Sequence, residues 1–376
     1  MNLVFCDRIS KYTRPHWTKC TIRVLSARHT LNKVSQENKS GMALIEELGI
    51  DLGTVNVLVY VRGRGIVLQE PSVVAQQVGN GEIVAVGEEA RAMMGRAPET
   101  IQVRRPLRSG VIADYRVTRG MLAHFINRSV GKIRLFKPHV IVTVPFEATQ
   151  VERRAVREAT LEAGASRAYL IPEPLAGAVG AGLPIHTPGG HMIVDLGGGA
   201  SQAAVLSVYG VVTSAAVRGG GVRMDEAIAA YVRRKYNLML GLPTAEEAKI
   251  RIGAAKAMEK PMLMEVQGRD QVTGLPRSVE ITSDDIAEAL EEPIMMVINM
   301  VKSVLERTPP ELASDIIDRG MTMIGGGSLL RNLDQLLTQE TGVPVYVADA
   351  PMACVAVGAG KAHALLPYLQ RTLDKL

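Results

Sequence analysis

Two short turns in this sequence place an aspartate and glycines directly after an apolar run. The first reads Asp51-Leu52-Gly53 and the second reads Asp195-Leu196-Gly197. Glycine lets the backbone approach a ligand closely and turn its N–H groups toward an anion, and a neighbouring aspartate suits a hydrated divalent cation. Facing each other, two such turns would hold the phosphates of a metal-bound polyphosphate. One turn alone indicates little more than a tight hairpin, so the duplicated pair carries this prediction.

A third glycine cluster, Gly325 to Gly327, follows the apolar run 321–324, and a helix is expected from near Ser328. A strand, a glycine loop and a helix in this order can hold a nucleoside or a phosphate against the helix N-terminus. The cluster is neither a P-loop nor a dinucleotide-binding fingerprint, because no Gly-Lys-Ser/Thr follows and the G-x-G-x-x-G spacing is absent. Taken alone, a crowded strand-to-helix turn explains it equally well.

Around these turns the sequence alternates strand and helix patterns. Apolar, β-branched runs predict strands over 47–53, 55–61, 66–75, 139–145, 167–171, 191–199, 201–208 and 209–217. Helices are expected between Thr149 and Gly164, and over 173–182 and 224–236. Such alternation is typical of sheets flanked by helices. Because an Asp-Leu-Gly turn follows an apolar strand in each half, we expect a duplicated α/β fold with two lobes that face a cleft.

Composition and charge exclude several classes of protein. With 376 residues, of which 47% are hydrophobic, the chain can bury a core in each of two domains. Residues 1–41 carry eight lysines and arginines and two acidic residues. Their net charge of +6 therefore exceeds the net charge of +5 of the whole chain. The remainder is therefore close to neutral, and no nucleic-acid partner is expected.

Residues 1–41 show no sustained period and end in a polar run, which predicts an unstructured extension or a start codon placed too far upstream. The alternative is a basic arm for a membrane surface or a partner. No apolar run approaches the roughly 20 residues that cross a bilayer, and no signal peptide is recognisable. The three scattered cysteines provide neither a disulfide framework nor a zinc site. A cytoplasmic location is expected.

Several longer motifs resemble the MreB family, the bacterial homologues of actin. They are DLGTVN, VIADYRVTRGML, ERRAVREATLEAGA, DLGGG, MDEAI and TPPELASDI followed by RGMTMIGGGSLLRNLD, and the resemblance runs from about Met42 to about Leu365. It implies an actin-like ATPase fold of two duplicated, ribonuclease H-like lobes, each with a mixed sheet flanked by helices. Four subdomains would surround a cleft for ATP or ADP with Mg²⁺.

On this resemblance we expect a first lobe over 42–185, with a small inserted subdomain at about 76–108. The second lobe would cover 186–343, with a small insert at about 226–283. The segment 344–376 would return to the first lobe. Residues 1–41 would stand outside this plan.

The resemblance also assigns candidate site residues. Asp51 and Asp195 would hold Mg²⁺ through water. The first phosphate loop would comprise Gly53, Thr54, Val55 and Asn56, and the second Gly197, Gly198 and Gly199. The adenosine would contact Gly325, Gly326, Gly327, Ser328, Leu329, Glu246, Glu247, Ala248 and Lys249. We expect a helix opened by Thr244, with Glu247 completing a capping box; the alternative for Glu247 is that it serves only as that cap.

Glu173 aligns with the glutamate that family members use to orient the attacking water. Hydrolysis of a phosphoanhydride mainly requires the positioning of water and metal, which one carboxylate at the cleft can assist. On the sequence alone, a helix-start carboxylate beside Pro174, favoured by the helix dipole, explains Glu173 equally well.

Three departures from the family pattern lower the expected hydrolysis rate more than binding. The usual GGGTTE ends here in Ala200-Ser201-Gln202, which removes a threonine hydroxyl thought to help hold the catalytic water. Val222-Arg223 replaces an acidic pair that precedes Met-Asp, and Pro172 replaces a glutamate before Glu173.

The loop 132–138 places Leu135 and Phe136 among three cations, a composition that can insert at a membrane interface while the cations meet anionic headgroups. Family members use a Leu-Phe pair here for this purpose; the alternative is that both side chains pack back into the lobe. The resemblance implies a slow ATPase that forms a homopolymer of paired protofilaments on the inner face of the cell membrane. It would determine rod shape and guide peptidoglycan elongation with RodZ, MreC, MreD and RodA.

Two other classes share the phosphate turns. An actin-fold phosphotransferase or phosphatase would carry larger inserted subdomains and a catalytic aspartate, and the candidate insert at about 76–108 is small. A heat-shock chaperone would need a substrate-binding domain after the nucleotide domain, for which the sequence leaves no room before Leu376.

Overall fold

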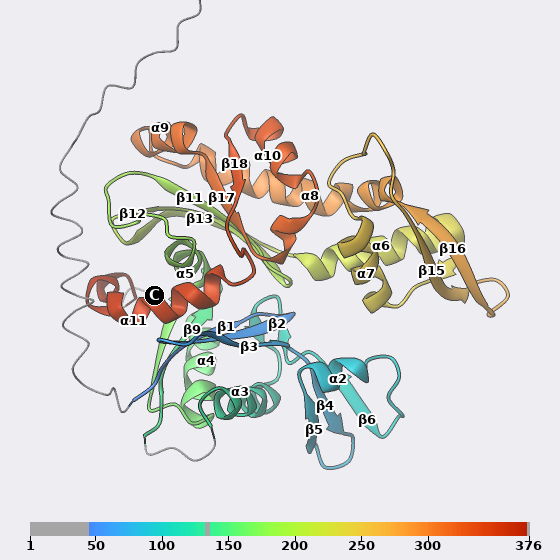
Figure 1. The fold of residues 1–376 in the computed structure, drawn as a ribbon, viewed down its shortest axis with the longest axis horizontal. Coiled ribbons are helices and arrows are strands. Elements are labelled where there is room, and N and C mark those ends of the chain that lie inside the picture. The colour runs from blue at the N-terminus through green and yellow to red at the C-terminus, as the bar shows by residue number, and fades with distance from the viewer. Residues whose placement is uncertain (1–44, 132–135, 374–376) are drawn as a thin grey trace, which may run out of the picture. The chain divides into compact units, whose positions relative to one another are not determined.

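Two five-stranded mixed sheets form the centre of the structure. The computed structural model describes residues 45–131 and 136–373, with side chains up to residue 369 (Figure 1). The first sheet contains β1 (Glu47–Leu52), β2 (Asn56–Val61), β3 (Gly65–Pro71), β9 (His139–Val144) and β10 (Arg167–Pro172). The second contains β11 (His191–Leu196), β12 (Ala200–Ser207), β13 (Gly210–Arg218), β17 (Met321–Ile324) and β18 (Val345–Val347).

The two sheets follow the same plan. Their strand orders are β10-β9-β1-β2-β3 and β13-β12-β11-β17-β18. In each sheet the first strand of the sequence lies in the centre, pairs antiparallel with the next strand and pairs parallel with a later one. This repetition is the one that the two Asp-Leu-Gly turns predict, since each turn joins the central strand to its antiparallel neighbour. We term the first sheet, with the elements inserted between its strands, the first lobe. The second sheet, with its own inserted elements, is the second lobe.

Helices α5 (Glu173–Gly180) and α11 (Cys354–Leu373) lie between the two sheets (Figure 1). Their apolar residues share one buried cluster with side chains of both sheets, among them Ile171 of β10 and Ile193 of β11. The two helices approach each other closely, because a Cβ at Gly358 would overlap the carbonyl oxygen of Ala176. α11 also joins the first sheet, where His363 Nε2 donates to Leu48 O at 2.9 Å.

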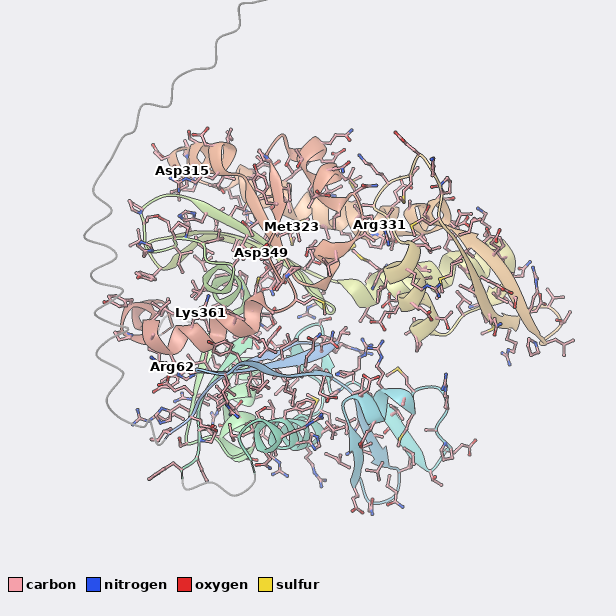
Figure 2. The ribbon with its side chains drawn as sticks, in the orientation of Figure 1. Arg62, Asp315, Met323, Arg331, Asp349 and Lys361 are labelled. Carbon is pink, nitrogen blue, oxygen red and sulfur yellow. The ribbon has the colours of Figure 1, made fainter. Side chains whose placement is uncertain are left out.

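In the described part of the chain, five further helices cover the outer faces of the two five-stranded sheets. α3 (Tyr115–Val130) and α4 (Gln150–Glu162) pack against the first sheet, with Phe125 fully buried. α8 (Ser283–Glu306), α9 (Pro310–Arg319) and α10 (Leu333–Thr341) belong to the second lobe, whose core includes Met323 of β17 (Figure 2). The helix predicted after Thr149 is confirmed, because Thr149 and Glu152 form a capping box at its start.

Each lobe carries a smaller sheet. In the first lobe this sheet contains β4 (Val74–Gln77), β5 (Ile83–Val86) and β6 (Ile101–Arg104), and it packs against α2 (Glu88–Ala92). The short pair β7 (Leu107–Arg108) and β8 (Val111–Ile112) follows in the sequence. In the second lobe, β14 (Leu238–Met239), β15 (Leu263–Asp270) and β16 (Pro276–Thr282) accompany α6 (Gly221–Tyr236) and α7 (Leu242–Ile252). None of the helices among the described residues is both long and apolar enough to cross a bilayer.

Three predicted helix starts are wrong. α7 begins at Leu242, with Gly241 as its N-cap and no side-chain cap, so the capping box of Thr244 and Glu247 does not form. Pro243 explains this, because proline favours the first turn of a helix. α6 begins at Gly221 instead of 224. Ser328 lies in a short 3₁₀ turn, η1 (Gly326–Leu329), and the α-helix after it starts only at Leu333.

Candidate functional site

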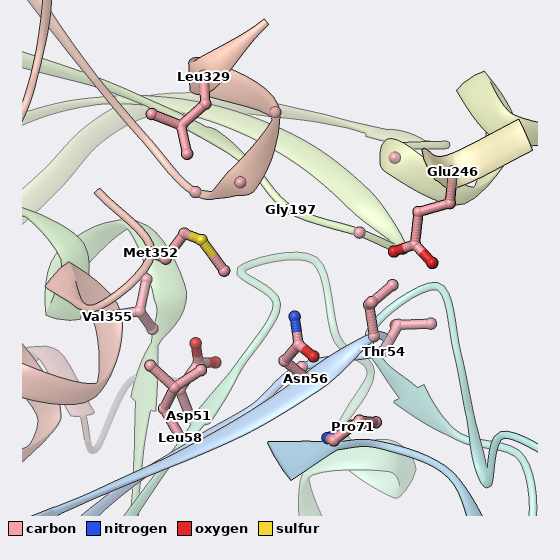
Figure 3. A pocket seen from close by; sticks show the side chains of 18 of the residues that line it. Asp51, Thr54, Asn56, Leu58, Pro71, Gly197, Glu246, Leu329, Met352 and Val355 are labelled. Carbon is pink, nitrogen blue, oxygen red and sulfur yellow. The ribbon is translucent and has the colours of Figure 1, made fainter. Parts of the chain in front are cut away.

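A cavity of about 690 Å³ lies between the lobes, at the ends of the central strands β1 and β11 (Figure 3). Its first-lobe wall includes Asp51 and residues 53–56, and its second-lobe wall includes Asp195 and residues 197–199. Gly325, Gly326, Gly327 and Leu329 close one side, and Glu246 and Lys249 stand at another. The volume is within the range of small-molecule sites.

The two glycine turns touch at this cavity. A Cβ at Gly198 would overlap the side chain of Val55, and a Cβ at Gly199 would overlap Thr54. Thr54 is itself fixed, because its Oγ1 accepts a hydrogen bond from the Gly110 N–H at 2.7 Å. Only glycine at these positions lets the second turn reach the first, so backbone N–H groups from both lobes can converge on one anion.

Three carboxylates lie beside the turns: Asp195 is buried, and Asp51 and Glu173 are half-buried. Burial raises the pKa of Asp51 to about 7, against a smaller lowering by the Thr143 hydroxyl, which donates to its Oδ1 at 3.2 Å. Burial and the charge of Asp51 raise the pKa of Asp195 to about 7. Burial, followed by the charges of Asp195 and Asp51, raises the pKa of Glu173 well above its usual range. Ionised together they repel one another, so a cation among them would be strongly favoured.

Glu173 is the first residue of α5, directly after the N-cap Pro172. Its Oε2 accepts a hydrogen bond from Gln202 Nε2. The Gln202 amide is oriented by its other end, because Gln202 Oε1 accepts from the Phe146 N–H at 2.8 Å. The pairing of β11 with β12 places Gln202 directly opposite Asp195, so its side chain lies beside the carboxylates.

The glycine loop after β17 packs against the second aspartate. Gly325 has φ +82, and a Cβ there would lie 2.7 Å from Asp195 Oδ1, so this position requires glycine. Ser328 does not line the cavity, because it is buried and its Oγ donates to Gly325 O at 2.7 Å.

Among residues 45–131 and 136–373, no group of three or more His, Cys, Asp or Glu side chains could hold a metal ion by itself.

The four residues predicted on α7 separate into two pairs. Glu246 and Lys249 line the cavity. Lys249 Nζ lies 2.6 Å from Asp225 Oδ1 and donates to Gly221 O at 2.8 Å. Glu247 and Ala248 do not line it: Glu247 pairs with Arg251 at 3.2 Å in solvent, and Ala248 is buried in the core. The helical repeat explains this, because residues three apart share a face.

Comparison with known proteins decides the family. Residues 45–371 match the family model described as MreB/Mbl protein. The chain belongs to the MreB/Mbl family. It is 51% identical over 321 residues to the cell shape-determining protein MreB of Escherichia coli K12, covering 84% of this chain and 92% of the relative. It is 48% identical over 314 residues to the cell shape-determining protein Mbl of Bacillus subtilis 168, covering 84% and 94%.

Solved structures show the fold of this MreB/Mbl chain. MreB5 of Spiroplasma citri bound to ADP superposes with a TM-score of 0.82 at 34% identity, over 86% of this chain and 97% of that one. The MamK double helical filament superposes with a TM-score of 0.72 at 21% identity, over 85% and 98%, and this likeness concerns the fold alone. The MreB/Mbl chain therefore has the predicted actin-like α/β fold.

The cavity of the MreB/Mbl chain includes residues that sequence patterns did not indicate. Met224, Ile250, Met352 and Val355 contribute apolar wall, and Arg91 contributes a cation that pairs with Glu246 at 3.0 Å. These residues belong to elements far apart in the sequence and carry no local motif. Gln202 is a different case. In the sequence it stands out only as a departure from the family pattern, although its position opposite Asp195 across the hairpin is a usable signal.

The other departures are accommodated locally in the MreB/Mbl chain. Ser201 is buried, and its Oγ donates to Gly219 O at 3.1 Å, while Ala200 lines the cavity. Arg223 pairs with Glu292 at 3.2 Å. Of the predicted membrane pair, Leu135 lies outside the described residues, and Phe136 is 43% exposed.

Proposed function

We propose that this chain binds ATP or ADP with Mg²⁺ in the cavity between its lobes and polymerises into filaments. The observation that carries the proposal is the contact of the two glycine turns beside three carboxylates with raised pKa values. Backbone N–H groups from two lobes attract the phosphates, and the carboxylates attract a cation. Support also comes from MreB5 of S. citri, a 34% identical relative that was solved with ADP.

Within this proposal, residues 53–56 and 197–199 hold the phosphates, and Asp51 and Asp195 hold Mg²⁺ through water. The metal would neutralise phosphate charge. Gly325, Gly326, Gly327 and Leu329, with Glu246 and Lys249, hold the nucleoside. Glu247, Ala248 and Ser328 are left out of the proposed contacts, because none of them lines the cavity.

Slow hydrolysis would depend on Glu173. Its carboxylate is held by Gln202 at the cavity, where it can orient a water toward the terminal phosphate. Burial and the neighbouring carboxylates raise the pKa of Glu173, and a bound cation would lower this pKa and favour the ionised form that accepts a hydrogen bond from the water. ATP turnover would then set filament lifetime.

The cellular role we propose follows the names of the relatives, which are cell shape-determining proteins. Paired protofilaments would assemble at the inner face of the cell membrane, anchored by Leu135 and Phe136. There they would determine rod shape and guide peptidoglycan elongation together with RodZ, MreC, MreD and RodA. The exposure of Phe136 supports the membrane contact.

Nucleotide binding is tested by calorimetry with MgATP on the parent and on Gly199→Ala. The added methyl group would overlap Thr54 and separate the turns, so affinity should fall at least about tenfold. Gly79→Ala is the matched control, because a Cβ there meets nothing. Equal affinity in the parent and Gly199→Ala would contradict phosphate binding by the two glycine turns. No affinity in the parent would contradict the nucleotide function.

Filament formation is tested by sedimentation with and without ATP, and membrane binding by co-pelleting with vesicles containing anionic lipid. Leu135→Ser combined with Phe136→Ser should reduce vesicle binding and leave ATP-dependent pelleting intact. Val151→Ser, which removes a 78% exposed apolar side chain from α4, controls for general loss of surface hydrophobicity. Undiminished vesicle binding by the double variant would contradict the anchor.

A further inference from the structure

An ion pair at the wall of the cavity joins the two lobes. Arg91 belongs to α2 in the smaller sheet of the first lobe, and Glu246 belongs to α7 in the second lobe. Arg91 Nη2 lies 3.0 Å from Glu246 Oε2, and both residues line the cavity. Figure 3 shows the Glu246 carboxylate directed toward the side of the cavity formed by Thr54.

This contact differs from the other ion pairs. Among those formed by residues 45–131 and 136–373, it is the one that joins the first lobe to the second. Its side chains are 37% and 16% exposed, which shields them from solvent more than a fully exposed pair. Salt screens such a pair, but less than it screens two charges in open water.

A second cation of the first lobe faces the same carboxylates. Burial lowers the pKa of Arg105, and the charges of Glu246 and Asp225 oppose this by attracting the guanidinium. Arg91 thus pairs with Glu246, and Arg105 is attracted by Glu246 and Asp225 and more weakly repelled by Arg91. Lys249 also holds Asp225. Charges of opposite sign meet across the cleft, and separating the lobes would leave the carboxylates without their first-lobe partners.

We propose that Arg91 and Glu246 form a latch that holds the lobes together over the nucleotide cavity and limits nucleotide exchange. The proposal rests on the proposed nucleotide function and adds a regulation to that site. A nucleotide enclosed between the glycine turns and α7 leaves when the lobes separate, and that separation breaks the ion pair. Because closed lobes oppose the entry of a nucleotide as well as its exit, the latch slows both steps.

The test is the kinetics of a fluorescent ATP analogue with Mg²⁺, measured by stopped flow on full-length protein. In Arg91→Ala, both the association and the dissociation rate constants should rise about fivefold, which corresponds to about 1 kcal/mol for a partly exposed ion pair. The dissociation constant should change less than about twofold. Arg91→Lys keeps the cation and should lie close to the parent. Arg96→Ala is the matched control, because Arg96 is an exposed arginine in the turn that follows α2.

Salt provides a second measurement. Raising the ionic strength from about 0.05 M to about 0.5 M should speed release from the parent, and this increase should be smaller in Arg91→Ala because the screened pair is already absent. An equal salt response in both proteins would contradict the latch.

The remaining outcomes separate the two proposals. Unchanged rate constants in Arg91→Ala, with the parent binding normally, overturn the latch alone. A faster dissociation with unchanged association identifies Arg91 as a direct nucleotide contact and also overturns the latch. A parent protein that binds no nucleotide overturns the proposed function, and the latch with it.

Discussion

At the scale of single residues, the site is defined by three carboxyl groups that are wholly or partly withdrawn from solvent. Asp51, Glu173 and Asp195 crowd one end of the cavity, and each has a raised pKa. Gln202 contributes no charge, but its amide joins Glu173 to the backbone N–H of Phe146. Two changes test these roles separately.

Gln202→Leu should lower ATP hydrolysis at least about tenfold and change nucleotide affinity less than about threefold. The variant leaves the Glu173 carboxylate without the donor that orients it, while the glycine turns remain in place. Single-turnover hydrolysis and equilibrium binding measure the two quantities. Gln335→Leu, at an exposed position on α10, is the control. Hydrolysis at the parent rate would show that Gln202 does not position Glu173.

Asp51→Asn should stabilise the nucleotide-free protein increasingly as the pH rises from 5 to 8. The pKa of Asp51 in the folded protein is raised from 3.8 to about 7, so folding favours the neutral carboxyl. That contribution is complete below the unfolded pKa and is lost as the pH rises through the folded one. Asparagine keeps the acceptor for Thr143 and never ionises.

Thermal unfolding of parent and Asp51→Asn across this pH range measures the effect. We expect the smallest difference in melting temperature near pH 5 and an advantage of several degrees for the variant near pH 8. With Mg²⁺ and nucleotide the order should reverse, because the parent then binds the cation. A melting difference that does not depend on pH would contradict the raised pKa.

At the scale of elements, α5 and α11 connect the lobes by backbone-to-backbone packing. Gly358 of α11 meets the Ala176 carbonyl, and Gly180 of α5 meets the Cys354 carbonyl. Side chains of both sheets enclose the pair in one apolar cluster. The position of Glu173 at the start of α5 therefore also depends on the contact between α5 and α11.

Gly358→Ala should destabilise the protein by about 2 kcal/mol, because the methyl group forces two closely packed helix backbones apart. Denaturant unfolding of the nucleotide-free protein measures this change. Gly79→Ala, at an open position, should change stability by less than about 0.5 kcal/mol. Equal stability of Gly358→Ala and the parent would show that the helices can separate without cost.

At the scale of the whole molecule, each lobe supplies one of the two glycine turns that line the cavity. Residues 53–56 come from the first lobe, while 197–199 and 325–327 come from the second. A ligand held by all of them should couple motions of segments that are distant in the sequence.

Amide hydrogen exchange tests this coupling. Addition of MgADP should slow exchange in 53–56, 197–199 and 325–329 together, and should leave the open turn around Gly79 unchanged. Protection confined to one lobe would contradict a clamp formed by both.

The sequence by itself determined the duplicated plan. Apolar runs predicted the central strands of both sheets, and the paired Asp-Leu-Gly turns indicated where a polyphosphate would lie, because strand period and glycine turns are local properties. The Thr149 capping box was predictable for the same reason. The starts of α6 and α7 were not, since glycine and proline near a helix start leave several positions open.

Only the tertiary structure decided which side chains meet. It brought Arg91 to Glu246 and Gln202 to Glu173, and it turned Glu247 away from the cavity that Glu246 and Lys249 line. It also packed α5 against α11. Contacts across a cleft or between helices depend on the relative placement of distant elements, and no pattern within one short segment records that placement.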